Sequence, residues 1–368
     1  MFIEKIEKDN LLNSLQKIIG IVERKQTLPI LSNVLIEKTE SNIRFIATDL
    51  EIQISTQFTD PNQISPDTAI TVAAKKLLEI LKVLPEASKV TLDIHENRLL
   101  VKVNKSKFTL QTLPALDFPK VLETLEQALK IQIEQGKLKK LFGMVQYAMA
   151  QQDIRYYLKG VLLVIDGSFL KLVATDGHRL AYIIAKLDQE YPKREIILPR
   201  KTVNELIRLL ADTEEKITFE LAENQVRMTF SDIVLVSKVI DGKFPDYERV
   251  IPSYTNQLTL NRIEILQALQ CAATLSNEQF RGVRFVLTDN NLRIISNNSE
   301  QEEAQEDMEI EYQGTALDVG FNVNYLMDGL NSTASQTVIL SFGDSNSSVL
   351  ITIPGNEEFK YVVMPMRI

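Results

Sequence analysis

One pattern recurs in VLIEKTESNIRFIATDLE (Val34–Glu51), VLLVIDGSFLKLVATDGHR (Val161–Arg179) and VRFVLTDNNLRIISNNSE (Val283–Glu300). Each stretch has an apolar run rich in β-branched residues, a polar turn, a second apolar run and a short polar end, which predicts a β-hairpin. The hairpins recur about 120 residues apart, which is a typical domain length and not the period of a solenoid or propeller. The chain is therefore predicted to contain three similar domains.

A helical pattern precedes each hairpin and a second one follows it. In the first repeat, Leu11, Leu15, Ile18 and Val22 fall on one face of a helix with a period of about 3.6 residues. The other predicted helices include Leu138–Met149 and Ile265–Ala273 before the hairpins, and begin at Ala73, Pro199 and Asn322 after them.

Further strands with polar turns follow the second helix of each repeat. The predicted order in a domain is β-α-β-β-β-α-β-β-β, with two helices packed on antiparallel sheet, which is an α+β fold. We expect the three domains to span residues 1–125, 126–253 and 254–368. The acidic stretch Glu300–Glu309 is expected to be a solvated loop.

The composition limits the possible classes of protein. With 45% hydrophobic and 24% charged residues in 368, the chain is typical of a soluble globular protein. It has no apolar stretch of the roughly 18 residues that span a bilayer, and MFIEKIEKDN at the N-terminus lacks a signal-peptide core, so we expect a cytoplasmic protein without a membrane partner. The formal net charge of -8 argues against binding nucleic acid by bulk charge, so any DNA contact requires a local basic surface.

Few residues suited to metals or nucleophilic catalysis are present. The single cysteine, Cys271, excludes an intramolecular disulfide framework and a cysteine-rich zinc site, and its apolar helical neighbours predict a small packing residue. His95 and His178 are the only histidines. We therefore expect no cofactor and no metal.

Five phrases in order along the chain carry a family resemblance: TLPILSN (Thr27–Asn33), ATDGHRLA (Ala174–Ala181), FPDYERVIP (Phe244–Pro252), LSNEQFRGVR (Leu275–Arg284) and YVVMPMRI (Tyr361–Ile368). The chain resembles the bacterial DNA polymerase III β subunit, the sliding clamp, over all three repeats. The resemblance implies three domains of the DNA clamp fold and a head-to-tail homodimer that forms a six-domain ring around duplex DNA. It also implies a non-catalytic subunit that confers processivity on the replicative polymerase.

The resemblance also implies a set of partners. Duplex DNA would be held without sequence specificity, and a second copy of the chain would complete the ring. A clamp loader complex would open it, since nothing in the sequence resembles an ATP site. The other implied partners are the DNA polymerase III catalytic subunit, translesion polymerases, mismatch-repair proteins and ligase, which would use short clamp-binding motifs.

Four residues are implied to form the dimer interface. By resemblance, Phe108 and Leu110 of the first domain would face Thr274 and Leu275 of a partner's third domain. Two unlike surfaces can close a two-fold ring when the rotation between the copies allows it. The alternative is that these four residues belong to ordinary domain cores.

Basic residues gather on the predicted helices and could form a positive lining for DNA. For a single helix, a solvated lysine-rich face is the simpler interpretation. By resemblance, Gln152, Tyr156 and Tyr157 also lie near DNA, although paired tyrosines are common in cores. The predicted DNA-facing set is Arg24, Lys25, Lys75, Lys76, Lys139, Lys140, Gln152, Tyr156, Tyr157, Arg200 and Lys201.

Two segments that differ between the repeats predict a partner-binding cleft. The second hairpin alone ends in ATDGHRLA, and the chain ends in the unusually apolar VVMPMRI, where methionines suit a groove for several apolar peptides. The resemblance implies the same cleft. Its expected residues are Leu158, Thr175, Gly177, His178, Arg179, Leu180, Pro245, Arg249, Val250, Asn322, Tyr325, Val362, Met364, Pro365, Met366 and Arg367.

Two alternative functions remain open at the level of the sequence. Asp176 and His178 could form a catalytic dyad of a hydrolase, but no serine or cysteine nucleophile motif, glycine-rich phosphate loop or carboxylate cluster accompanies them. The three domains could also form an interaction scaffold that does not enclose DNA. The sequence alone does not separate that scaffold from a closed ring.

Overall fold

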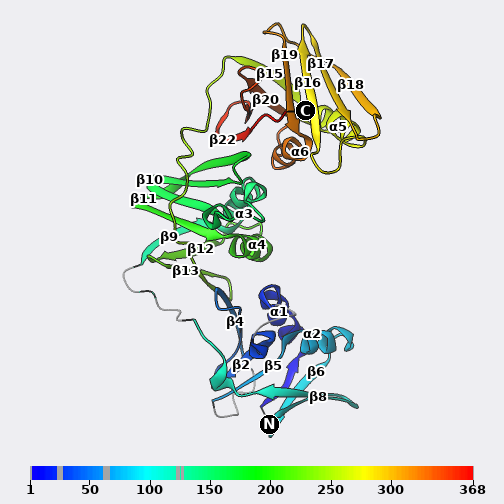
Figure 1. The fold of residues 1–368 in the computed structure, drawn as a ribbon. Helices are drawn as coiled ribbons and strands as arrows, with labels where there is room; N and C mark the ends of the chain where they lie inside the picture. The colour runs from blue at the N-terminus through cyan, green and yellow to red at the C-terminus, as the bar shows by residue number, and fades with distance from the viewer. Residues whose placement is uncertain (1, 23–27, 61–66, 122–124, 126–127, 368) are drawn as a thin grey trace. The chain divides into compact units, whose positions relative to one another are not determined.

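The computed structural model describes residues 2–22, 28–60, 67–121, 125 and 128–367 (Figure 1). The chain divides into two compact units, residues 1–137 with 208–239 and residues 138–207 with 240–368. The described strands form a twelve-stranded sheet in the first unit and a six-stranded and a four-stranded sheet in the second. Every strand pair with a recorded register in these sheets is antiparallel, as predicted.

The first repeat contains one strand more than the sequence predicts. Four strands lie between its helices because Thr68–Ala73 also forms a strand. This strand is followed at once by the helix that begins at Ala74, so its apolar residues could not be separated from those of the helix in the sequence. The elements are β1 (Ile3–Glu7), α1 (Lys8–Ile18), β2 (Asn33–Lys38), β3 (Asn42–Thr48), β4 (Ile52–Thr59), β5 (Thr68–Ala73), α2 (Ala74–Val83), β6 (Lys89–His95), β7 (Arg98–Val103) and β8 (Ser106–Leu113).

The second repeat has two long strands in place of four short ones. The halves of β10 on either side of Gly167, whose φ is +57°, pair with different halves of β11. The helices are shorter than predicted, since α3 ends at Gly143 and only a short 3-10 turn follows. The elements are β9 (Leu129–Glu134), α3 (Gln135–Gly143), β10 (Gly160–Thr175), β11 (Arg179–Pro199), α4 (Arg200–Leu209), β12 (Lys216–Leu221), β13 (Gln225–Phe230) and β14 (Ile233–Lys238).

The third repeat has the same order as the first. Asn261 and Asn322 cap the first turns of α5 and α6 through their side-chain oxygens, which fixes where both helices begin. The elements are β15 (Asn256–Asn261), α5 (Arg262–Ala273), β16 (Gly282–Thr288), β17 (Asn291–Asn297), β18 (Glu303–Glu309), β19 (Leu317–Asn322), α6 (Val323–Asn331), β20 (Thr337–Phe342), β21 (Val349–Ile353) and β22 (Asn356–Val363).

Two sequence expectations for the third repeat are wrong. Most of the acidic stretch is not a loop, because Glu303–Glu309 forms β18 and pairs along its whole length with β17. Cys271 does not pack in the core but lies exposed on α5, whose buried face is formed by Ile265, Leu266, Ala268, Leu269 and Ala272. The apolar residues around Cys271 in the sequence therefore lie on the other side of the helix.

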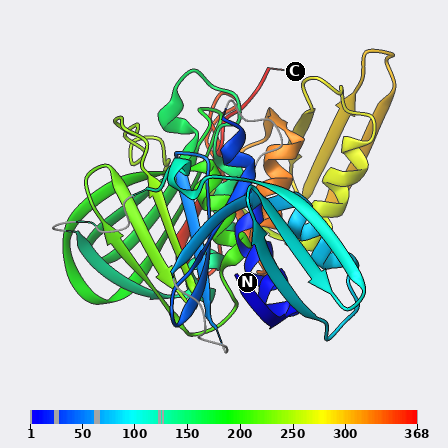
Figure 2. The ribbon, with the colours of Figure 1, turned by 90° about the horizontal axis from the view of Figure 1, so that it is seen from below.

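Each helix buries one face on its sheet. In the first unit α1 and α2 lie side by side, and α2 buries Leu77, Leu78 and Leu81. In the second unit α5 lies against β17 and β18 (Figure 2). None of the helices in the described part of the chain is long and apolar enough to cross a membrane.

Candidate functional site

Strand pairing brings together the two segments that the sequence singled out. In the six-stranded sheet β11 pairs with β22, so that Arg179 lies opposite Val363 and Leu180 opposite Val362. The chain then continues past β22, where the backbone N–H of Met364 donates to the carbonyl of His178 at 2.8 Å. The end of the second hairpin and the C-terminal segment therefore lie side by side at the same end of the six-stranded sheet.

The turn between β10 and β11 is held by its own side chains. Thr175 Oγ1 donates to the carbonyl of Arg179 at 2.6 Å, and the backbone N–H groups of His178 and Arg179 donate to Asp176 Oδ1 at 2.9 and 3.1 Å. Gly177 has a φ of +90°, and a Cβ there would come within 2.9 Å of the Arg155 guanidinium. The positive φ favours glycine here, whereas the flexible end of the Arg155 side chain could move away from an added Cβ.

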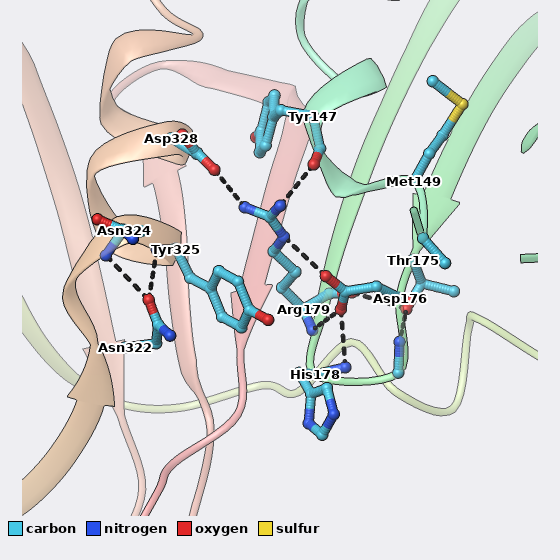
Figure 3. A network of polar contacts seen from close by, with 12 residues as sticks. Tyr147, Met149, Thr175, Asp176, His178, Arg179, Asn322, Asn324, Tyr325 and Asp328 are labelled. Carbon is cyan, nitrogen blue, oxygen red and sulfur yellow. Dashed lines mark hydrogen bonds and ion pairs between the residues drawn. The ribbon is translucent and has the colours of Figure 1, made fainter. Parts of the chain in front are cut away.

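A buried arginine connects this turn to the third repeat (Figure 3). Arg179 Nε donates to Asp176 Oδ2 at 3.0 Å, Nη1 to Asp328 Oδ2 on α6 at 2.5 Å, and Nη2 to the carbonyl of Tyr147 at 2.6 Å. Its guanidinium carbon lies 4.3 Å from the centre of the Tyr325 ring. All three nitrogens therefore have partners, as a cation with only 9% of its side chain exposed requires.

The surroundings of Arg179 keep it charged. Burial alone would lower the pKa of its guanidinium, but interactions with Tyr361, Asp328 and Asp176 together raise that pKa above its ordinary value. Burial also raises the pKa of the Tyr147 and Tyr361 hydroxyls well above the usual value, so both stay neutral at physiological pH. The charge of this cluster is thus carried by Arg179 and its two carboxylate partners.

Beside the turn lies a mostly apolar cavity of about 220 Å³, which we call the cleft. Nine residues predicted for the cleft line it: Leu158, Thr175, Gly177, Arg179, Leu180, Pro245, Val250, Val362 and Met364. Met364 is 45% exposed at its rim, whereas Leu180 and Val362 are buried in its floor. A concave apolar surface with one charged group in its wall is a typical ligand site.

Seven other predicted residues do not line the cavity: His178, Arg249, Asn322, Tyr325, Pro365, Met366 and Arg367. Tyr325 supports Arg179, and the backbone N–H of Met366 donates to the carbonyl of Gly320 at 2.9 Å. Asn322 caps α6, and Arg249 is solvent-exposed and pairs with Asp246 at 2.8 Å. These residues flank the cleft or support its walls.

Two residues that line the cleft were not predicted for it, Arg155 and Tyr247. Arg155 donates to both carboxylate oxygens of Asp153, at 3.1 and 2.9 Å, and these hydrogen bonds lower the pKa of Asp153 to about 2. Tyr247 lies within the quoted phrase FPDYERVIP, and Arg155 directly precedes Tyr156 and Tyr157, which were predicted to lie near DNA. Both residues lie close in the sequence to predicted cleft residues, Arg155 to Leu158 and Tyr247 to Pro245, and this closeness could have indicated that they line the cleft.

Asp176 and His178 are not arranged as a catalytic dyad. Both oxygens of Asp176 are occupied by backbone N–H groups of the turn and by Arg179, and the His178 side chain is exposed. Among the described residues no group of three or more His, Cys, Asp or Glu side chains could hold a metal ion. Asp176 therefore stabilises the turn that forms one wall of the cleft.

The residues predicted to face DNA have different environments. Lys76 and Lys140 are exposed, Lys75, Lys139 and Lys201 are half-buried, and Arg24 and Lys25 lie outside the described residues. Arg200 donates to the carbonyls of Met149 and Ala150, at 3.2 and 3.5 Å. The exposed Gln152 and Tyr156 could reach a ligand, whereas Tyr157 packs against the apolar cluster beneath the cleft.

The four predicted interface residues lie at two unlike places in the fold. Phe108 and Leu110 are on β8, which is half-buried at Phe108 and buried at Leu110. Thr274 and Leu275 follow the end of α5, where Thr274 is exposed and Leu275 half-buried. The two pairs belong to different units of one chain.

Three repeats of two helices on antiparallel sheet, with a cleft whose wall is held in place by Arg179, have the architecture of a three-domain DNA clamp. Family models agree with this class: residues 1–122 match the DNA polymerase III beta subunit N-terminal domain, residues 132–246 its central domain and residues 248–367 its C-terminal domain. The beta sliding clamp of Pseudomonas putida is 43% identical over 366 residues, which cover 99% of both chains.

Solved structures give the same result. A sliding clamp from Pseudomonas aeruginosa bound to griselimycin has a TM-score of 0.94 and 42% identity, with 99% of each chain covered. The C. crescentus beta sliding clamp, with PEG bound to a putative beta-motif tethering region, has a TM-score of 0.93 and 33% identity, with 99% of this chain and 98% of that chain covered.

The chain belongs to the bacterial DNA polymerase III β-subunit family, the β sliding clamps. It is a non-catalytic subunit that acts in DNA replication by conferring processivity on DNA polymerase III. The hydrolase alternative is therefore wrong, and family membership favours a sliding clamp over a scaffold that does not enclose DNA.

Proposed function

We propose that two copies of this chain close head to tail into a ring around duplex DNA, and that the cleft holds short segments of the proteins that the ring tethers. The main support for the tethering role is the cleft, because it combines a buried apolar floor with an adaptable methionine at its rim. A partner held there rebinds DNA at a high effective concentration instead of diffusing away. Processivity then requires no specific affinity for DNA.

Two sheet edges support a head-to-tail ring. β8 pairs with β7 along its length but with β5 only at Thr112 and Leu113, and β18 pairs only with β17 among the described strands. Exposed edges of this kind can pair with another chain. The β7–β8 hairpin carries Lys105 and Lys107, whereas β18 carries Glu303, Glu306, Asp307 and Glu309. The two edges have opposite charge, which favours a contact between them.

The proposed track for DNA is the set of helix residues named above, with Lys76 and Lys140 as its most exposed members on α2 and α3. Contacts between lysine and phosphate carry no sequence information and weaken with salt, which suits a protein that slides. We propose the bacterial cytoplasm as the site of action. We also propose domain boundaries after residues 125 and 253, close to the limits of the three family matches.

The proposed partners follow from the cleft and the ring. They are the DNA polymerase III catalytic subunit, translesion polymerases, mismatch-repair proteins and ligase, each through a short apolar segment. A separate clamp loader would open the ring. Since all these proteins would share one cleft, their segments should compete with one another for it.

Retention on DNA tests the ring. Protein loaded onto a nicked circular plasmid should remain bound through gel filtration, and cutting the circle once should release it within minutes as it slides off the ends. Retention would be measured as labelled protein that co-elutes with DNA. Equal retention on circular and linear DNA would reject encirclement.

Removal of the C-terminal segment tests the cleft. Deleting Met364–Ile368 removes part of the cleft wall, and we expect no measurable binding of a peptide from the polymerase clamp-binding segment. Met364→Ala should weaken that peptide by about tenfold, because it removes an apolar side chain that lines the cleft. Fluorescence anisotropy measures both, and sedimentation should show an intact dimer. Leu116→Ala, which truncates a side chain that is 98% exposed, is the control. Unchanged affinity in the deletion would reject the assignment.

A further inference from the structure

A second hollow adjoins the cleft. It has a volume of about 600 Å³ and is lined by Tyr182, Tyr247 and Tyr254, with Glu248, Glu357 and Lys360 among its charged residues. We call it the tyrosine groove. Tyr247 lines both the groove and the cleft, so the two hollows meet at this side chain.

The groove and the cleft share one apolar floor. Leu180 and Val362 of the cleft belong to the same buried cluster as Leu350, which lines the groove. The three tyrosines pack against this cluster from the outside and are only partly buried. A peptide that leaves the cleft past Tyr247 would therefore stay in contact with one continuous surface.

The chemistry of the groove suits a cation. The rings of Tyr182 and Tyr247 lie 5.9 Å apart and are inclined by 31°, and Lys360 Nζ already lies 6.0 Å from the centre of the Tyr182 ring. Tyrosine faces attract ammonium and guanidinium groups at such distances. The groove thus already accommodates one ammonium group against a ring.

Carboxylates strengthen this preference. Partial burial first, and then the Glu248 carboxylate, raise the pKa of Tyr247 to about 12, and the same two causes raise the pKa of Tyr182. The Glu248 carboxylate therefore lies close enough to act electrostatically on both hydroxyls. The Glu248 side chain is 69% exposed although its carboxylate lies 3.6 Å from Lys171 Nζ, so the carboxylate remains accessible to another cation.

We propose that the tyrosine groove receives a lysine or arginine side chain from the residues that flank the segment held in the cleft. This proposal rests on the proposed function of the cleft. Within the groove, the cation lies against the tyrosine rings and pairs with Glu248 and Glu357. Partners with a basic flank would accordingly be preferred over partners with the same apolar segment and a neutral or acidic flank.

Flank-matched peptides test the proposal on the full-length protein. The probe is the clamp-binding segment of the polymerase catalytic subunit, either unextended or extended at one end or the other by Lys-Lys, Gln-Gln or Glu-Glu. For one of the two ends, Lys-Lys should lower the Kd by about three- to tenfold relative to Gln-Gln, and Glu-Glu should raise it. Fluorescence anisotropy at low and high salt measures the difference, which should shrink with salt.

Matched variants separate the groove from the general charge of the protein. Glu248→Gln/Glu357→Gln should abolish the Lys-Lys advantage and leave the unextended peptide unaffected. Glu214→Gln/Glu223→Gln removes the same charge from exposed sites on the other unit and should preserve the advantage. Equal Kd values for the three flanks, tighter binding of Glu-Glu, or an advantage that survives Glu248→Gln/Glu357→Gln would each overturn the proposal. Failure of the unextended peptide to bind would instead reject the cleft.

Discussion

At the scale of single residues, Arg179 decides the shape of the cleft wall. Its guanidinium joins the β10–β11 turn, the carbonyl of Tyr147 and Asp328 on α6 in one cluster (Figure 3). These contacts lie within the chain itself, so the wall is already in position before a proposed partner segment binds. Such preorganisation lowers the entropy cost of binding.

Arg179→Lys should therefore weaken partner binding. Lysine keeps the charge but cannot form the planar three-way set of hydrogen bonds, and we expect an increase in Kd of about tenfold for the polymerase peptide. Asp328→Asn should cost less, and adding it to Arg179→Lys should cost almost nothing further, since the two residues act through one contact. Anisotropy titrations of the three variants measure this coupling.

A matched pair elsewhere provides the control. Arg293 pairs with Asp307 at 2.8 Å on the exposed face of β17 and β18, so Arg293→Lys alters a comparable contact away from the cleft. Its Kd for the peptide should match that of the unmodified protein. Strictly additive effects of Arg179→Lys and Asp328→Asn would show that the connection to α6 does not position the wall.

At the scale of secondary-structure elements, α1 is tied to the hairpin of β13 and β14. Lys17 Nζ on α1 lies 2.6 Å from Asp232 Oδ1, and Thr56 Oγ1 on β4 donates to Asp232 Oδ2 at 2.5 Å. Arg208 adds hydrogen bonds to the carbonyls of Gln16 and Lys17. These contacts lie where β4 of the first repeat pairs with β14 of the second, so they brace the junction of the two repeats.

Stability should depend on pH through Asp232. Burial alone would raise the pKa of its carboxyl, but hydrogen bonds from Lys17 and Thr56 lower it below the ordinary value. Because the folded-state pKa is depressed, the stabilisation is present above the ordinary value of about 3.9 and is lost as pH falls through the folded-state pKa. Asp232→Asn should cost about 1 kcal/mol at pH 7, a figure reduced because the pair is partly exposed.

Thermal unfolding measures this effect. The difference in Tm between the unmodified protein and Asp232→Asn should be constant from pH 7 to about 5 and should close below about 4, near the ordinary pKa of Asp. Asp241→Asn, at an exposed site, serves as the control and should show no such closing difference. A difference that widened as the pH fell would contradict the depressed pKa.

Elements with a buried face could be predicted from the sequence, and elements without one could not. α1 and α2 follow apolar periods because each buries one side, and β2 and β3 are apolar runs because most of their residues are buried. β18 shows no such period, since its residues are alternately exposed and half-buried, and it is a strand only because β17 pairs with it. Arg179 was predicted for the cleft, but its partner Asp328 lies 149 residues away, a contact that no local pattern encodes.

At the scale of the whole molecule, the distribution of charge over the surface affects the proposed binding to DNA and to a second copy more than the net charge does. The net charge of -8 would oppose binding to DNA if it were spread evenly. Among the described residues, the lysines proposed to face DNA are on helices, whereas β18 concentrates carboxylates at a sheet edge. We propose that these lysines contact DNA and that the acidic edge of β18 contacts the partner copy.

The strength of the proposed dimer should therefore depend on opposite charges at its two edges. Lys105→Glu/Lys107→Glu places negative charge on the β7–β8 hairpin, and we expect the dimer Kd to rise at least about tenfold because like charges then face each other. Glu303→Lys/Glu306→Lys alone should weaken the dimer similarly, and the combined variant should recover much of the loss. Sedimentation velocity across a dilution series measures the Kd.

Lys82→Glu/Lys89→Glu, at exposed sites elsewhere in the first repeat, should leave the dimer unchanged. If all four variants dimerised equally well, β8 and β18 would not meet in the ring.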